Sequence, residues 1–381
     1  MTWSIMSAQP AAISGRSNYL DILDEAWQAH LAPREPNAPT VISTFAGAGG
    51  SSLGYSMAGF RELLAVEWDD NAVATFRLNF PDVPVYHGDI ARLSVEQVLE
   101  TTGLQPGELD VFDGSPPCQG FSTAGKRQID DPRNQLFREY VRLLRGLQPK
   151  VFVMENVSGM VKGKMKLVFV DILRELKASG YRVSARLLNA MYFNVPQSRE
   201  RMIFIGVRDD LGIEPSHPKA EAQPIACGSV IAGCRATRSQ RINPWIDALR
   251  PAATLCKMDA GYEILSLTQT DLAEAEIKRS WQMYRVLAGI ESHKPEVLVR
   301  LNASQPSPTI QKDAGNTTTG MVHPYEIRRL TIPEIKRLAS FPDEYQMIGT
   351  FKERWARIGN SVPPLFMRAI ARHIRAEILR A

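Results

Sequence analysis

The sequence predicts an α/β protein with a doubly wound, mostly parallel sheet and a smaller, irregular second domain. Buried-strand segments alternate with amphipathic helical segments through residues 40–207, and a glycine-rich turn follows the first strand. The alternation fades between residues 208 and 325, where glycine, proline, serine and threonine become frequent. Because ligands of doubly wound sheets bind beyond the carboxyl ends of the strands, we expect the functional site there.

Composition excludes few classes of protein. The chain has 381 residues and a formal net charge of +4, which permits a polyanionic partner without requiring one. The four cysteines form no CxxC pair and the six histidines add no ligand pattern, so we expect no metal site and no disulfide framework. No apolar run is long enough to cross a membrane and no signal segment begins the chain, which favours a cytoplasmic protein.

Residues 1–39 form a leader that ends in several prolines. Within it, Leu20, Leu23, Trp27 and Leu31 follow nearly helical spacing. We therefore expect a short amphipathic helix that packs on the main domain, and we assign it no chemistry.

Three successive strand ends carry residues typical of a nucleotide site. The first predicted strand, residues 40–45, leads into a glycine-rich turn whose backbone can approach a ligand where a helix begins. Glu67 ends the second strand, where an acid suits ribose hydroxyls, and Trp68 beside it suits an adenine ring. Asp89 follows the third strand and is placed to accept from an exocyclic amine. Together they predict a pocket for an adenine nucleoside.

The fourth strand leads to a single cysteine on a stiff approach. Pro116 and Pro117 restrict the backbone immediately before Cys118, and the glycines and serines after it indicate a loop. A cysteine in an arbitrary sequence is more often a buried structural thiol. The only histidine in the converging segments is His87, which better suits the nucleotide site, so a cysteine–histidine pair is disfavoured. The function of Cys118 therefore depends on its other neighbours.

Adjacent strand ends add a carboxyl group and two arginines. Glu155 ends the fifth strand, and the polar turn before the last strand carries Arg199 and Arg201. A thiolate paired with a carboxylic acid suits attack on an electron-poor ring, such as C6 of a cytosine whose N3 is hydrogen-bonded. The adduct can accept a methyl group at C5, after which a base removes the C5 proton and the thiolate leaves.

The last part of the chain turns helical. Thr331 suits a helix N-cap, with Pro333 in the first turn and Glu334 at the third helical position. After residues 359–364 a closing helix runs through residues 365–378. This helix is expected to end the fold.

These segments, taken in order, resemble the bacterial type of DNA (cytosine-5) methyltransferase, which uses S-adenosylmethionine. The resemblance covers residues 40–207 and 326–378, whereas residues 208–325 match only by location, as the target-recognition domain. It implies the class I fold of S-adenosylmethionine-dependent methyltransferases. We expect a leader (1–39), a catalytic cofactor-binding domain (40–207), the recognition domain (208–325) and a C-terminal segment (326–381) whose helix returns to the catalytic domain. The motifs that carry the resemblance are Phe45-Ala46-Gly47-Ala48-Gly49-Gly50, Glu67-Trp68, Gly88-Asp89-Ile90, Pro116-Pro117-Cys118-Gln119, Glu155-Asn156-Val157, Gln197-Ser198-Arg199-Glu200-Arg201, residues 329–342 and Gly359-Asn360-Ser361-Val362-Pro363-Pro364.

The resemblance also implies roles for single residues. Cysteine attack on a flipped-out cytosine, with a carboxyl at N3 and the first arginine supporting the base, involves Cys118, Glu155, Arg199 and Arg201. S-adenosylmethionine, which leaves as S-adenosylhomocysteine, is expected to contact Phe45, Ala46, Gly47, Gly49, Gly50, Glu67, Trp68, Asp89, Ile90, Asp113, Pro116, Asn360, Ser361 and Val362. DNA contacts are expected from Gln119, Ser122, Lys126, Arg127, Arg133, Arg238 and Lys312.

The implied partner is double-stranded DNA that carries a specific recognition sequence, and we expect a monomer in the bacterial cytoplasm or nucleoid, without membrane association. A restriction–modification role beside a separate cognate endonuclease and a solitary regulatory role both stay open. An RNA cytosine-5 methyltransferase on the same scaffold is the nearest alternative, but the long segment 208–325 favours DNA. A non-catalytic regulator is disfavoured by the intact Cys118, Glu155 and Arg199, and a dehydrogenase leaves Asn360 without a role.

Overall fold

The computed structural model describes residues 18–117, 135–161, 165–234, 263–266, 297–312, 320–325 and 329–380. The centre of the protein is a seven-stranded sheet with the strand order β3-β2-β1-β4-β5-β7-β6. Neighbouring strands are parallel except at β7, which is antiparallel to both β5 and β6. The predicted doubly wound, mostly parallel sheet is thereby confirmed. Its strands are β1 (Thr40–Thr44), β2 (Arg61–Glu67), β3 (Val85–His87), β4 (Val111–Gly114), β5 (Val151–Val157), β6 (Tyr181–Asn189) and β7 (Glu200–Arg208).

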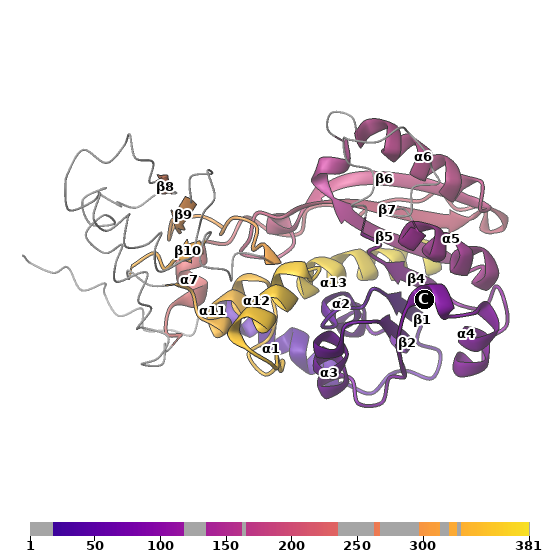
Figure 1. Cartoon of the computed structure of the whole chain (residues 1–381), viewed down its shortest axis with the longest axis horizontal. Coiled ribbons are helices and arrows are strands. Elements are labelled where there is room, and N and C mark those ends of the chain that lie inside the picture. Colours follow the sequence, from indigo (N-terminus) through magenta and orange to yellow (C-terminus); the bar gives the residue numbers. More distant parts are fainter. Residues whose placement is uncertain are drawn as a thin grey trace, which may run out of the picture.

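Helices cover both faces of this sheet (Figure 1). Successive strand residues point to opposite faces, so each strand supplies two cores. Ile42 and Phe112 belong to the core under α4, α5 and α6, whereas their sequence neighbours Val41 and Val111 belong to the core under α1, α2, α3 and α13. The helix bounds are α1 (Asn18–Leu31), α2 (Gly50–Met57), α3 (Asp70–Asn79), α4 (Val95–Thr102), α5 (Gln135–Leu147), α6 (Met165–Lys177), α7 (Cys227–Ile231), α11 (Ile332–Leu338), α12 (Phe351–Asn360) and α13 (Pro364–His373).

The C-terminal segment returns to the central sheet and packs against its first helix. At Gly54 in α2, an added Cβ would lie 2.5 Å from the Met367 Cβ and 2.7 Å from the Pro364 carbonyl oxygen of α13. The two helices can approach this closely because Gly54 has no side chain. The segments that begin and end the central fold are thus joined along α2.

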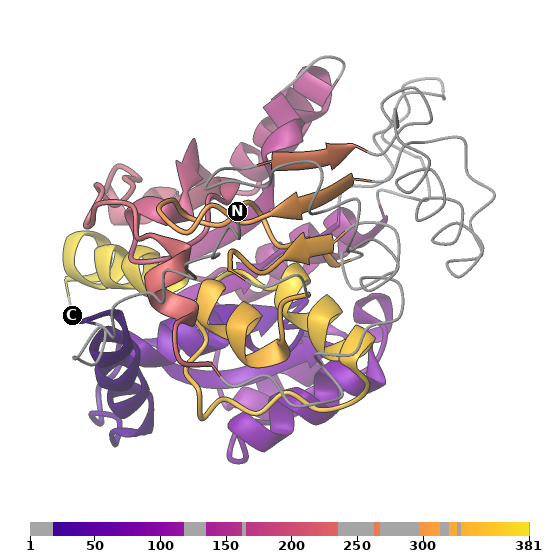
Figure 2. The same ribbon diagram turned by 90° about the vertical axis from the view of Figure 1, so that its left-hand side faces the viewer.

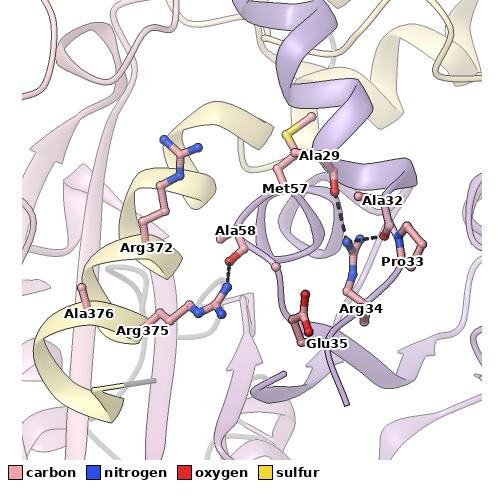
Figure 3. A pocket seen from close by; sticks show the side chains of 11 residues that line it. Ala29, Ala32, Pro33, Arg34, Glu35, Met57, Ala58, Arg372, Arg375 and Ala376 are labelled. Carbon is pink, nitrogen blue, oxygen red and sulfur yellow. Dashed lines mark hydrogen bonds between the residues drawn. The ribbon is translucent and has the colours of Figure 1, made fainter. Parts of the chain in front are cut away.

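The predicted N-terminal helix is present as α1, which packs in the core with α2 and α13. Figure 3 shows the end of this interface, a cavity of about 510 Å³ near the last turns of α1 and α2. Arg34 donates to the carbonyls of Ala29 (3.1 Å) and Ala32 (2.8 Å), and Arg375 donates to that of Ala58 (3.1 Å). These arginines satisfy carbonyls that a helix C-terminus leaves without partners. We therefore assign this cavity a structural role, at the place where α1, α2 and the C-terminal segment meet.

A second, smaller sheet belongs to the part of the sequence predicted to be irregular. It consists of β8 (Glu263–Ser266), β9 (Val297–Arg300) and β10 (Gly320–Val322), in the order β10-β9-β8. Figure 2 shows these strands beside one another, above α11 and α12. Strand β10 is parallel to β9 and β8 is antiparallel to it. The limits of the recognition domain at residues 208 and 325 stay a prediction.

Helix α11 begins as its sequence predicts. The Thr331 hydroxyl accepts from the Glu334 amide (3.4 Å), and the Glu334 carboxylate accepts from the Thr331 amide (2.6 Å). This reciprocal capping box satisfies two amides that the helix cannot pair itself. Across the described ranges, no helix is long and apolar enough to cross a membrane.

Candidate active site

A cavity of about 620 Å³ opens at the carboxyl ends of β1, β2, β4 and β5, where the direction of the strand order reverses. Many of the predicted cofactor residues line it together: Phe45, Ala46, Gly47, Gly50, Glu67, Trp68, Asp113, Pro116, Asn360, Ser361 and Val362. The predicted catalytic residues Glu155, Arg199 and Arg201, and the predicted DNA contact Lys312, also line it. Residues from the early and the late part of the sequence therefore line the same cavity.

The glycine-rich turn after β1 forms one wall of the cavity. Phe45, Gly47 and Gly49 have positive φ angles of 55°, 57° and 84°, so the chain reverses tightly before α2. Gly49 lies behind the turn, where an added Cβ would meet the Tyr345 hydroxyl at 2.6 Å and Phe80 at 2.8 Å. Glycine is thus required at Gly49 by both its conformation and its surroundings.

Glu67 fixes this turn from the end of β2. Its carboxylate accepts from the amides of Gly47 (2.7 Å), Trp68 (2.8 Å) and Asp69 (3.0 Å). The Trp68 side chain beside it is 75% exposed although it lines the cavity, so its ring is available to a ligand. Acid and indole thus lie side by side, as the sequence predicts for a nucleoside.

The third predicted strand end lies elsewhere. Neither Asp89 nor Ile90 lines the cavity. The Asp89 carboxylate accepts from the Ala91 amide (3.0 Å) and caps a short 3₁₀ helix, Ile90–Arg92. Its predicted bond to an exocyclic amine stays a prediction.

Asp113, at the end of β4, is a buried acid in the floor of the cavity. It accepts from the hydroxyls of Ser51 (2.6 Å) and Tyr55 (3.2 Å) of α2. Burial raises the pKa of this carboxyl to about 7 and the charge of Glu155 also raises it, although the two hydroxyls oppose the shift. Asp113 can therefore change its charge near neutral pH.

The chain after β4 is held in a fixed direction up to the cysteine. Pro116 and Pro117 line the cavity, and the Asn156 side-chain amide donates to the Pro116 carbonyl (3.2 Å). The predicted residues Cys118, Gln119, Ser122, Lys126, Arg127, Arg133 and Arg238 lie outside the described residues.

Glu155 forms an ion pair with Arg201. The Arg201 Nε lies 2.6 Å from a Glu155 carboxylate oxygen, and the two side chains are only 13% and 12% exposed. They come from adjacent antiparallel strands, β5 and β7, so the sheet itself sets their separation. Because the ion pair is short and largely shielded from water, it holds the carboxylate in one orientation in the cavity.

The two predicted arginines differ in their surroundings. Arg199 is 2% exposed, and its two Nη atoms donate to the carbonyls of Ile310 (3.1 Å) and Gly359 (3.0 Å). Burial, assisted by the charge of Arg201, lowers the pKa of Arg199 to about 9. The resemblance assigns support of the base to the first arginine, whereas it is the second that pairs with the carboxyl of Glu155.

The comparisons with known proteins agree with this site. Residues 39–376 match the family described as "C-5 cytosine-specific DNA methylase". The chain belongs to this family. It is therefore a DNA (cytosine-5) methyltransferase, which acts on C5 of cytosine in DNA, and S-adenosylmethionine is the methyl donor of such enzymes. The Cys-Gln and Glu-Asn-Val motifs of the sequence thus belong to a methyltransferase.

Relatives and solved structures cover most of the methyltransferase. The type II methyltransferase M1.HphI of Haemophilus parahaemolyticus is 34% identical over 348 residues, covering 87% of this chain and 85% of the relative. M.XorII of Xanthomonas oryzae is 31% identical over 360 residues, covering 88% and 84%. The crystal structure of a putative DNA modification methyltransferase from an E. coli prophage has a TM-score of 0.65 at 25% identity, covering 90% of this chain and 100% of the other. The DNMT2 structure of Spodoptera frugiperda, with a TM-score of 0.60 at 19% identity and covering 87% and 98%, shows the shared fold.

Among the cavity residues that were not predicted from the sequence, Arg357 and Asn156 make the most informative contacts. Arg357 lines the cavity and pairs with Asp69 (3.0 Å), which caps α3. Asn156 positions the proline approach. A signal was present for each, because Arg357 stands two residues before the Gly359-Asn360 motif and Asn156 directly follows Glu155. In the described part of the methyltransferase, no group of His, Cys, Asp and Glu side chains suits a metal ion.

Proposed function

We propose that the methyltransferase transfers a methyl group to C5 of a flipped-out cytosine within a specific duplex DNA sequence, through a covalent bond between Cys118 and cytosine C6. The observation that carries this proposal is the Glu155–Arg201 pair, because it lies in the same cavity as the glycine-rich turn and the Pro116-Pro117 approach to Cys118. The ion pair can recognise a base, the turn forms part of a nucleoside-type pocket, and the two prolines lead to the proposed nucleophile.

The cavity fits S-adenosylmethionine in size and in chemistry. Its volume of about 620 Å³ lies within the range of roughly 300–1,000 Å³ of small-molecule sites. The Glu67 carboxylate suits the ribose hydroxyls and the exposed Trp68 ring suits the adenine, while Asn360, Ser361 and the turn around Gly47 line the same cavity and would hold the methionine part. When bound, the cofactor supplies an electrophilic methyl group.

The protein groups account for the reaction at cytosine. The Cys118 thiolate adds to C6 while the Glu155 carboxyl engages N3, which draws electron density out of the ring. Electron density then returns to C5, which takes the methyl group, while the electron pair of the broken methyl–sulfur bond would stay on S-adenosylhomocysteine. A base removes the C5 proton, the C5–C6 double bond reforms, and the bond from C6 to the Cys118 sulfur breaks. The thiolate is regenerated, so one enzyme molecule turns over repeatedly.

We assign the support of the base to Arg201 and a structural role to Arg199. The Arg201 guanidinium holds the Glu155 carboxylate at 2.6 Å and lines the cavity, where it can also reach a base. Arg199 uses two nitrogens to hold the main chain at Ile310 and Gly359. It therefore joins the cavity to the returning C-terminal segment.

Cytosine must leave the duplex before a thiol can reach C6. Extrusion of a base costs a few kcal/mol. Lys126, Arg127 and Arg133 follow Cys118 in the sequence and can offset part of this through phosphate contacts, and Lys312 stands exposed at the cavity. Gln119, Ser122 and Arg238 complete the proposed DNA contacts. We therefore propose that residues 119–134 contribute to DNA binding.

The relatives named as type II methyltransferases suggest a restriction–modification role. We propose that a cognate endonuclease acts separately on the same sequence and that the methyltransferase works as a monomer, since all its proposed catalytic groups come from one chain. A place in the bacterial cytoplasm or nucleoid, where such DNA lies, stays a prediction.

The decisive experiment uses duplex DNA in which the target cytosine carries fluorine at C5. In the presence of S-adenosylmethionine C5 would take the methyl group, but fluorine cannot then leave as a proton, so the Cys118 adduct should persist and shift the protein on a denaturing gel. Cys118→Ser should give no adduct and no methyl transfer while still binding DNA. Cys227→Ser is the matched control, because Cys227 is buried with its thiol donating to the Asn302 carbonyl (3.1 Å). Wild-type turnover by Cys118→Ser would exclude the mechanism, and labelled methyl incorporation into tRNA rather than duplex DNA would exclude the substrate.

A further inference from the structure

We propose that helix α1 and Tyr345 act together as a brace that positions the glycine-rich turn for the cofactor. This inference rests on the proposed role of that turn in binding S-adenosylmethionine. Helix α1 ends at Leu31, before the family match begins at residue 39. It is therefore a feature of this chain that the matched domain does not include.

Several hydrogen bonds hold the turn, and one of them comes from the C-terminal segment. Glu67 accepts from the Gly47 amide (2.7 Å), and the Ala46 carbonyl accepts from the Gly49 amide (2.9 Å). The bond from the C-terminal segment ends at the Ala48 carbonyl, which accepts from the Tyr345 hydroxyl. Ala48 is 1% exposed, so water cannot replace this donor without opening the structure.

Tyr345 is itself fixed by its main chain and by its ring. The buried Lys336 side chain donates to the Tyr345 carbonyl and to the Asp343 carbonyl (2.8 Å), which ties this stretch to α11. The Tyr345 ring is 5.1 Å from that of Phe341 and 6.4 Å from that of Phe80. The hydroxyl thus reaches the turn from a rigid base.

Helix α1 closes this arrangement from behind. The ring of Trp27 lies 6.4 Å from that of Tyr345, edge to face, and the ring of His30 lies 5.2 Å from that of Phe80. At one end of α1 the Tyr19 hydroxyl donates to the Arg337 carbonyl of α11 (2.9 Å), and at the other the His30 Nδ1 lies 2.6 Å from the Ser56 hydroxyl of α2. Helix α1 therefore contacts α11, which supports Tyr345, at one end and α2, which follows the glycine-rich turn, at the other.

Removing the hydroxyl leaves a buried carbonyl in the turn without its donor. The turn can then relax away from the shape that Glu67 sets on its other side, and the backbone groups facing the cofactor move with it. Such a change weakens binding of the cofactor in the ground state and in the transition state alike. We therefore expect the Kd and KM for S-adenosylmethionine to rise, with little change in kcat.

The test is Tyr345→Phe, which keeps the ring and removes only the hydroxyl. The Kd for S-adenosylmethionine, measured by calorimetry without DNA, should rise about tenfold, as expected for one buried hydrogen bond. The kcat at saturating cofactor and the Kd for DNA should stay within about twofold. Tyr181→Phe is the matched control, because the buried Tyr181 also donates to a carbonyl, that of Pro149 (2.8 Å), at the opposite edge of the sheet. It should lower the Tm comparably and leave cofactor affinity unchanged.

A second pair of variants tests the helix. Trp27→Ala should raise the cofactor Kd in the same direction as Tyr345→Phe, and Trp27→Phe, which restores an aromatic edge, should recover most of the affinity. An unchanged Kd in both Tyr345→Phe and Trp27→Ala, or an equal loss in Tyr181→Phe, overturns the brace. Failure of the wild-type protein to bind S-adenosylmethionine would instead overturn the proposed function, so the two outcomes are separable.

Discussion

Glu155 and Arg201 lie diagonally across the adjacent strands β5 and β7, and their ion pair holds the Glu155 carboxylate in the cavity. Glu155→Gln keeps the shape of the side chain but cannot deliver a proton or hold a negative charge at N3. We expect kcat to fall by about 100-fold or more, as for loss of a general acid. Single-turnover transfer of labelled methyl groups into duplex DNA measures the change.

The control for this variant is Glu139→Gln. Glu139 also pairs with an arginine at 2.6 Å, that of Arg142, but on α5 away from the cavity. It should leave kcat unaltered. A fall of less than about tenfold in Glu155→Gln would show that another group supports the base.

The carboxyl group of Glu62, near the start of β2, is a second buried acid group. Neither of its carboxyl oxygens has a hydrogen-bond partner in the described structure, although the Ser43 and Ser52 hydroxyls stand near it. Burial raises the pKa of Glu62 from 4.5 to about 8, and the charge of Asp113 adds to the shift. The folded state therefore keeps a proton that the unfolded state releases as the pH rises above 4.5.

The sign of the effect on stability follows from this difference in bound protons. The contribution of the protonated carboxyl is complete below the unfolded pKa and is lost as the pH rises through the folded pKa. Glu62→Gln stays neutral at every pH. We expect its free energy of unfolding, relative to the wild type, to improve by on the order of 1–3 kcal/mol between pH 5 and pH 8.5. Thermal unfolding across that pH range measures the difference. Glu100→Gln is the control: Glu100 is exposed, so the difference in unfolding free energy between this variant and the wild type should not change with pH.

The sequence predicted which side chains could act in the site better than it predicted the surroundings of each side chain. The glycine-rich turn, Glu67 and Asp89 were predicted to share a site because parallel strands end at the same edge. The turn and Glu67 line one cavity, whereas Asp89 does not. The different surroundings of Arg199 and Arg201 could not be predicted, because both side chains have the same chemistry. Burial separates them, and burial of Arg199 depends on Ile310 and Gly359, which are far away in the sequence.

At the scale of elements, the contact of α2 with α13 depends on the absence of a side chain. Gly54→Ala places a Cβ within 2.5 Å of the Met367 Cβ, so the two helices must separate. We expect a loss of about 1–3 kcal/mol, the usual effect of overpacking. Chemical denaturation measures it. Gly159→Ala is the matched change, because its added Cβ meets nothing within 4 Å, and a similar loss in both would contradict the packing explanation.

Regular elements were predictable where one local signal dominated. Helix α1 follows from the spacing of Leu20, Leu23, Trp27 and Leu31, and the start of α11 follows from its capping residues. The sheet β8-β9-β10 was not predicted, because its strands are short and pair across long stretches of sequence. Such pairing leaves no periodic signal in a single segment.

At the scale of the whole molecule, the affinity for DNA should fall as salt rises, and each exposed lysine or arginine that contacts a phosphate should contribute to this dependence. Lys312 is exposed at the rim of the cavity, near the proposed path of the DNA. If it contacts a phosphate, Lys312→Met should weaken binding similarly for all sequences and reduce the slope of log K against log salt by about 1. Fluorescence anisotropy at several salt concentrations measures the slope.

Lys177→Met provides the comparison. Lys177 is exposed in the last turn of α6, which packs on the edge strand β6, and it does not line the cavity. It should leave the slope unchanged. An equal slope for the wild type and Lys312→Met would remove Lys312 from the DNA contacts.

The cavity joins residue 45 to residue 362, and this has a consequence for biosynthesis. The glycine-rich turn is made early, but the wall formed by Asn360, Ser361 and Val362, and the hydroxyl that holds Ala48, are made near the end of the chain. Contacts between such distant segments form late in folding, because a long loop must close first. A nascent or truncated chain that stops before residue 345 therefore lacks one wall of this cavity, and we expect the methyltransferase to become competent to mark DNA only after residues 345–362 have been made.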